Sequence, residues 1–191
     1  MRSAVQVCGL CLGFLGSVCA VVSLQVRAWK NSSDDGDVII TSKIYENLWT
    51  SCAEDSTGTF NCWFYPSVLA LPAYIQACRA LMITSVVLGA LGVSATLVGM
   101  QCSKVGGENY RLKGRITALG GVAFILQGLC TMTAVSWYAS IVVQTFFDPL
   151  HPGTRFEIGE GLYIGWCSAA LVLIGGTSLL CTSGNADDEK W

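Results

Sequence analysis

Charge is the scarcest property of this 191-residue sequence. Asp, Glu, Lys and Arg together make up 13% of the residues, about half of the share that is usual in soluble domains. So few charges cannot cover a water-facing surface, while 52% of the residues are hydrophobic. The apolar excess must therefore face something other than water, and lipid is the simplest candidate.

Catalytic patterns are also missing. The chain has one histidine and contains no HExxH, GxSxG or Walker-type motif. Its formal net charge of −2 excludes the strongly basic surface that is typical of nucleic-acid binding. We therefore expect a protein that is not an enzyme, that needs no cofactor and that binds no nucleic acid.

Four long apolar stretches are present instead, and each reaches the roughly 20 residues that a helix needs to cross a bilayer. They are Ala4–Val26, Tyr74–Met100, Ile116–Val143 and Leu162–Cys181. Buried core helices of a soluble protein are the alternative, but the chain lacks the polar segments that would cover them. The first stretch is longer than the apolar core of a signal peptide, so it is expected to be retained as a helix.

The basic residues predict the orientation. Loop 101–115 carries four of them against the single acid Glu108: Lys104, Arg111, Lys113 and Arg115. The positive-inside rule places this loop in the cytoplasm, together with both termini and the tail at 182–191. The loops at 27–73 and 144–161 are then extracellular.

Cysteine positions agree with this topology. Eight of the ten cysteines lie in or at the ends of the apolar stretches, whereas Cys52 and Cys62 lie in the first outer loop. An extracellular loop is oxidising, so we expect these two to form a disulfide, which would contribute roughly 2–3 kcal/mol in the chain-entropy model. The alternatives are two free thiols or a metal site, for which this loop has no histidine.

The first outer loop also has strand-like segments. Strands are expected at Val38–Thr41, Leu48–Cys52 and Phe60–Tyr65, with a further one at Trp29–Ser33 and a turn at 56–59. A short helix capped by Ser67 would follow. The predicted fold is an all-α membrane bundle of four helices carrying an extracellular antiparallel β-sheet, α+β overall.

An ordered set of residues matches a known signature. Trp29, Leu48–Trp49, Cys52, Cys62 and Arg79 occur in the order that is typical of claudins, with Asn47 in place of the usual glycine. Peripheral myelin proteins and calcium-channel gamma subunits share a version of this pattern. Segments 76–79 and 146–150 favour claudins, so residues 1–191 resemble one claudin domain, the strand- and pore-forming protein of tight junctions.

The resemblance implies structural roles for the signature. Trp29, Leu48, Trp49 and Arg79 would anchor the sheet on the helices, although interfacial aromatic anchors and a snorkelling arginine are the plainer alternatives. It also implies a lateral contact between subunits. Phe146, Phe147 and Ile158 would form a pocket that receives Val68 of a neighbour, unless the two phenylalanines belong simply to an aromatic belt.

Two features concern the cytoplasmic side. Cys102 and Cys181 lie where S-palmitoylation is possible, although plain membrane-edge cysteines are an equal alternative. The last residues, 189–191, do not match the Tyr-Val ending by which claudins bind PDZ scaffolds. A removed tail and a different scaffold contact both remain open.

Both outer loops are net acidic, which favours cations, although a solvated face is the plainer alternative. Within the claudins, the sequence resembles the cation-channel branch. The resemblance implies a paracellular channel for small cations such as sodium, with Asp55 as the main selectivity residue and Glu54 beside it. Its partners would be itself and other claudins, within one membrane and across two. A non-conducting barrier protein and an auxiliary subunit of a conventional ion channel are the alternatives. Phe64 stands where some cation-selective relatives have an acid.

Overall fold

The computed structural model describes residues 2–33, 42–65, 67, 71–100, 110–148 and 154–184. Several expected features lie outside these residues. They are the strand at Val38–Thr41, the short helix after Ser67, Val68, Cys102 and the tail at 185–191.

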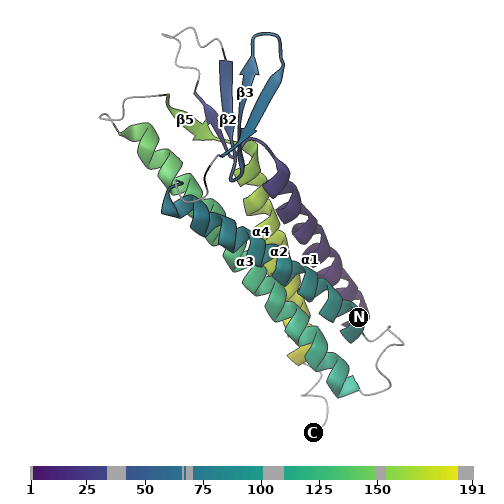
Figure 1. Cartoon of the computed structure of the whole chain (residues 1–191). Helices are drawn as coiled ribbons and strands as arrows, with labels where there is room; N and C mark the ends of the chain where they lie inside the picture. Colours follow the sequence, from purple (N-terminus) through teal and green to yellow (C-terminus); the bar gives the residue numbers. More distant parts are fainter. Residues whose placement is uncertain are drawn as a thin grey trace.

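Four long helices form the body of the molecule (Figure 1). They are α1 (Arg2–Gln25), α2 (Ala73–Gly99), α3 (Tyr110–Phe147) and α4 (Glu160–Gly184), and each is long and apolar enough to cross a membrane. α3 begins six residues before the expected stretch at 116–143 and ends four residues after it. Its 38 residues span about 57 Å, so it is longer than a bilayer core is thick. It contains no proline, and Ala134 continues the helix without a break.

The helices approach closely where glycines face each other. A Cβ added at Gly175 of α4 would lie 2.8 Å from the backbone nitrogen of Gly13 and 2.8 Å from the carbonyl oxygen of Gly9, both in α1. No real side chain fits at such distances. Small residues therefore bring the α1 and α4 backbones into direct contact, which is the usual way to gain packing energy in lipid.

The sheet stands on one end of this bundle and has five antiparallel strands in the order β4-β3-β2-β1-β5 (Figure 1). The strands are β1 (Lys30–Ser32), β2 (Ser42–Glu46), β3 (Thr50–Asp55), β4 (Phe60–Phe64) and β5 (Phe156–Ile158). The expected start of the third strand at Leu48 is wrong, because residues 47–49 form a turn. β5 comes from the second outer loop and was not expected, because three residues are too few to show a strand pattern.

The β3–β4 hairpin is closed by a turn and by a disulfide. Gly58 has a φ of 77° and donates its N–H to the carbonyl of Asp55 at 2.8 Å, as in a turn that ends on a left-handed glycine. Cys52 lies directly opposite Cys62 in the register, and the two form the expected disulfide.

The main core lies where the sheet meets the helices. Trp29 and Leu48, at the base of the sheet, are fully buried against side chains of α2, α3 and α4, including Met82, Tyr138 and Leu162. The sheet therefore has no separate core of its own and shares one with the bundle.

Candidate functional site

Trp29 fills the junction between sheet and bundle. Its indole Nε1 donates to the carbonyl of Ser23 at 2.8 Å, and its ring meets the ring of Tyr138 edge-on, 5.2 Å between centroids. Gly161 is so close that a Cβ there would lie 2.5 Å from the Trp29 ring. Because these partners belong to α1, α3 and α4, one side chain ties three helices to the start of β1.

Asn47 closes the turn after β2, at the position where the claudin signature has glycine. Its Oδ1 accepts hydrogen bonds from the backbone N–H groups of Trp49 and Thr50, both at 2.7 Å. Its amide nitrogen donates to the carbonyl of Val26 at 3.2 Å. Side-chain bonds of this kind build an Asx turn. The substitution therefore keeps a tight turn and adds a bond to the residue that follows α1.

Arg79 is a buried cation beneath this turn. Its Nε donates to the carbonyl of Leu48 at 2.6 Å, and its guanidinium lies 4.6 Å from the centre of the Trp49 ring. The hydrogen bond and the cation–π contact offset the cost of burying the charge. Arg79 thus meets the signature pair Leu48–Trp49, some thirty residues earlier in the sequence, between sheet and bundle.

Tyr65 also belongs to this junction and lies near Arg79. Its ring centre lies 5.9 Å from the guanidinium, and its hydroxyl donates to the carbonyl of Asn47 at 3.4 Å. Burial, with a smaller contribution from the nearby Glu46 carboxylate, raises the pKa of the Tyr65 hydroxyl far above its usual value. The hydroxyl therefore stays neutral and remains a donor.

The register of the strands separates Glu54 from Asp55. Glu54 lies on the same face of the sheet as the Cys52–Cys62 disulfide, whereas Asp55, one residue later, lies on the opposite face. Only one of the two can therefore line a given side of the sheet.

Most acids on the described part of the sheet have a partner. Glu46 forms a 2.7 Å ion pair with Lys30, Glu54 accepts from the Tyr45 hydroxyl at 2.9 Å, and Glu157 accepts from the Ser33 hydroxyl at 3.0 Å. Each partner holds its carboxylate against the sheet. These three acids are thereby less available to a mobile ion.

Asp55 differs from these acids, because the group that bonds it belongs to the next residue, Ser56, and not to another strand. Asp55 lies at the exposed end of β3, where its Oδ1 accepts a hydrogen bond from the Ser56 backbone N–H at 2.7 Å. That bond fixes the direction of the side chain and leaves the carboxylate in contact with solvent.

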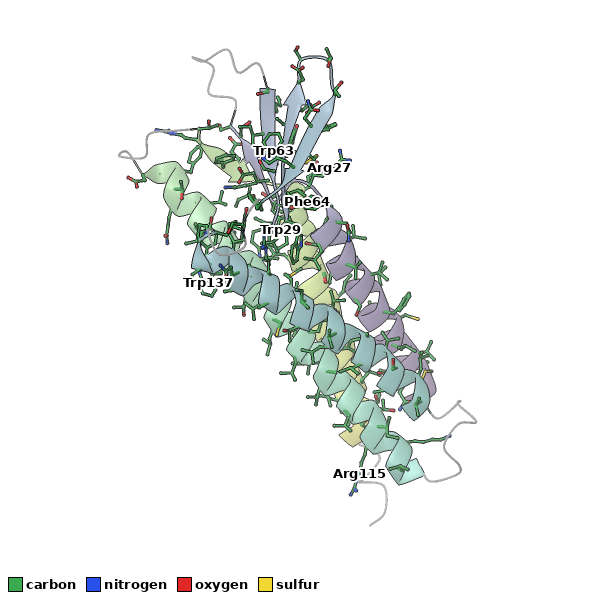
Figure 2. All side chains as sticks on the ribbon, in the orientation of Figure 1. Arg27, Trp29, Trp63, Phe64, Arg115 and Trp137 are labelled. Carbon is green, nitrogen blue, oxygen red and sulfur yellow. A yellow bond between two sulfur atoms is a disulfide. The ribbon has the colours of Figure 1, made fainter. Side chains whose placement is uncertain are left out.

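Three aromatic side chains lie uncovered on β4, an edge strand. Phe60, Trp63 and Phe64 are all exposed, and Phe64 is 78% accessible. Figure 2 shows Phe64 and Arg27 where the sheet meets the helices. The sequence predicted a strand here but gave no sign that its aromatic residues would remain outside the core.

The residues expected to make a lateral contact do come together. A lateral groove of about 270 Å³ runs between the end of α3 and β5. Its walls include Phe146, Phe147, Phe156, Ile158 and Tyr163. Val68, the expected occupant from a neighbour, is outside the described residues.

Lipidation sites and metal sites are two other classes to which cysteines can belong. Cys181 is exposed near the end of α4, whereas the other candidate for lipidation, Cys102, is not described. In the described part of the chain, no cluster of three His, Cys, Asp or Glu side chains could hold a metal ion.

Comparison with known proteins agrees with the fold and the signature. Residues 3–179 match the PMP-22/EMP/MP20/Claudin family. The chain is 45% identical to claudin-15 of Bos taurus over 190 residues, covering 98% of this chain and 81% of the relative. It is 48% identical to claudin-19 of Homo sapiens over 183 residues, covering 95% and 82%. Claudin-7 of Mus musculus is 40% identical, with 98% and 90% covered.

The chain therefore combines four apolar helices, a disulfide-linked sheet and a junction of signature residues. Nearly its whole length is also similar in sequence to claudins. The chain belongs to the PMP-22/EMP/MP20/Claudin family and, within it, is a claudin of tight junctions.

Proposed function

We propose that this claudin polymerises into tight-junction strands and forms a paracellular pore that prefers small cations such as sodium. The sheet would be extracellular and both termini cytoplasmic. The disulfide supports this orientation, since it requires an oxidising compartment on the side of the sheet. Lys113 and Arg115 support it too, because they lie at the start of α3, at the end of the bundle that is far from the sheet (Figures 1 and 2).

The observation that carries the proposal is the exposure of Asp55. It is a carboxylate at the tip of β3 that no cation of the described residues neutralises by an ion pair. Its neighbour Glu54 is held by Tyr45 and lies opposite Lys43 in the register. We therefore assign the main selectivity role to Asp55 and a smaller one to Glu54.

The energy that such a pore requires is modest. A tenfold preference for cations corresponds to ~1.4 kcal/mol. A carboxylate ~4 Å from a cation supplies about 1 kcal/mol at the dielectric constant of water and about 4 kcal/mol at an effective value of 20. One exposed acid per subunit in a narrow, wet passage is therefore sufficient, without a dehydrated binding site.

Polymerisation needs contacts between subunits, and the lateral groove is our candidate for those within one membrane. Phe147 is 75% exposed at its rim, which leaves a large apolar surface for a neighbouring chain to cover. The partners would be other copies of this chain and other claudins. Contacts across two membranes would involve the outer loops.

The function is tested by expressing the full chain in epithelial cells that lack tight-junction strands. Freeze-fracture microscopy is expected to show strands, and dilution potentials to show a sodium preference over chloride. Strands without conductance, or a preference for chloride, would contradict the channel proposal. Surface biotinylation controls for delivery to the membrane.

The lateral groove has its own matched pair of variants. Phe147→Ala removes an apolar side chain from the groove and is expected to shorten or abolish strands while the protein still reaches the surface. Leu119→Ala, on the same helix, removes a side chain that is similarly exposed but lies away from the groove. Equal loss of strands in both variants would remove the groove from the proposal.

A barrier function is the second candidate, and Phe64 favours it. Where some cation-selective relatives have an acid, this chain exposes an apolar ring. Fewer acids in the pore would weaken cation selectivity. Strands that raise electrical resistance without any charge preference would identify the barrier.

A further inference from the structure

A second groove lies between the end of α1 and the disulfide face of the sheet, and we call it the α1–β4 groove. Its volume is about 670 Å³. Leu24 and Gln25 of α1 form one wall, and Trp49, the disulfide and Phe64 form another, with Arg27 at the edge. None of these residues belongs to the lateral groove or to the proposed selectivity site.

The apolar wall of this groove is open to the outside. Phe64 is 78% exposed and Trp49 is 37% exposed, although both are large hydrophobic side chains. Such surface is unfavourable in water unless something apolar covers it.

Arg27 gives the groove a positive rim. The side chain is exposed, and its guanidinium lies 5.1 Å from the centre of the Phe60 ring. Among the described residues it forms no ion pair with an acid. The ring holds the guanidinium in place without neutralising it, so the charge remains available to an anion.

The groove lies at the depth of the membrane surface. The apolar span of α1 ends at Gln25, two residues before Arg27. The exposed Trp137 lies at the same depth on the other side of the bundle (Figure 2). Its neighbour in sequence, Tyr138, contacts Trp29 at the base of the sheet. Tryptophan at this depth and arginine just outside the hydrocarbon are both typical of the lipid headgroup layer.

We propose that the α1–β4 groove binds a phospholipid of the leaflet next to the sheet. The headgroup phosphate contacts Arg27, and the first part of an acyl chain covers Phe64 and Trp49. A lipid is favoured over a second protein chain because the groove is continuous with the lipid-facing surface of α1 through Leu24 and Gln25. Phe64 thereby attaches the edge strand β4 to the membrane. Some cation-selective relatives have an acid at this position, which would face water instead.

The test is photocrosslinking of the full chain in nanodiscs of palmitoyl-oleoyl phosphatidylcholine. The photoreactive residue p-benzoylphenylalanine replaces Phe64 in one variant and Asn61 in the control. Asn61 is on the same strand but pairs with Ala53, farther from the bundle, and faces the opposite side. p-Azidophenylalanine at position 64 serves as a second probe if the larger label disturbs folding. Intact mass spectrometry identifies the adduct.

Position 64 is expected to give a phosphatidylcholine adduct at least about fivefold more abundant than position 61. Adding Arg27→Gln is expected to lower that adduct about threefold, whereas Arg27→Lys retains most of it. Equal adducts at 64 and 61, an adduct with a second copy of the chain, or no response to Arg27→Gln would each overturn the proposal. None of these readouts depends on conductance, so they are independent of the channel proposal.

Discussion

The bundle and the sheet are stabilised in different ways. The bundle has long helices that touch through glycines, so that backbone lies on backbone, as at Gly175 and Gly13. The sheet has short strands and one wholly exposed edge, β4, and its most buried side chains point into the bundle. Trp29 and the Arg79 contacts attach the sheet to the bundle. The disulfide closes the β3–β4 hairpin within the sheet.

This difference has a physical consequence. The bundle does not need the sheet to bury its apolar surface, because lipid covers the apolar side chains that the helices do not bury against one another. The sheet does need the bundle, since a few short strands are marginal without a core. Damage to the junction should therefore affect both regions, and damage at the outer edge should affect the sheet alone.

The largest effect is expected from Trp29→Ala. The side chain is fully buried and contacts three helices, and truncation of such a residue costs about 3–5 kcal/mol. Thermal unfolding in detergent, followed by circular dichroism, is expected to shift down by roughly 10 °C. Trp63→Ala is the control, because that side chain is 51% exposed on β4 and its loss should change stability by less than about 0.5 kcal/mol. Similar shifts of the unfolding temperature in both variants would show that the buried junction contributes no more to stability than the exposed edge strand.

Gly175→Leu is expected to disrupt the contact between α1 and α4. The new side chain would meet the backbone of Gly9 and Gly13, and overpacking of this kind costs about 3 kcal/mol. Loss of monodisperse protein in size-exclusion chromatography and a lower unfolding temperature are expected. Gly114→Leu provides the comparison, because nothing lies within 4 Å of a Cβ at that position. A Gly175→Leu protein as stable as the Gly114→Leu protein would refute the close contact of α1 and α4.

Cys52→Ser combined with Cys62→Ser should loosen the sheet and spare the helices. The short closed ring predicts a loss of about 2–3 kcal/mol, confined to the region that the disulfide constrains. Hydrogen exchange is expected to accelerate in β2, β3 and β4 and to stay unchanged in the membrane-spanning part of α3. Faster exchange in the helices as well would show that the two regions are not separable.

The bundle was the easier region to predict from sequence. A run of about twenty apolar residues that crosses a membrane forms a helix, because the helix satisfies every backbone polar group internally where no water is present. The α+β fold, the disulfide and the claudin family were all predicted correctly. α3 extends beyond the expected apolar stretch at both ends, and at its start it runs through Arg111, Lys113 and Arg115, which carry no hydropathy signal.

The sheet was harder because its order depends on contacts between distant residues. β5 pairs with β1 although the two strands are more than a hundred residues apart in sequence, as Asn31 and Glu157 show. No local sequence pattern predicts this pairing. The sequence likewise gives no sign of the turn that Asn47 builds through its side-chain hydrogen bonds. The exposure of Phe64 is a third case, because alternation along β4 does not tell which aromatic residues the bundle will cover.

We propose that the exposed Asp55 at the tip of β3 sets most of the ion selectivity and that the partnered Glu54 beside it contributes less. The most direct test of this proposal is the dilution potential across epithelial monolayers expressing Asp55→Asn or Glu54→Gln, with strands verified by freeze-fracture. Asp55→Asn is expected to lower the sodium-to-chloride permeability ratio by about threefold or more, the loss of ~0.7 kcal/mol or more of cation attraction, whereas Glu54→Gln changes it less. An unchanged ratio in the Asp55 variant, or a larger effect from Glu54→Gln, would contradict the assignment.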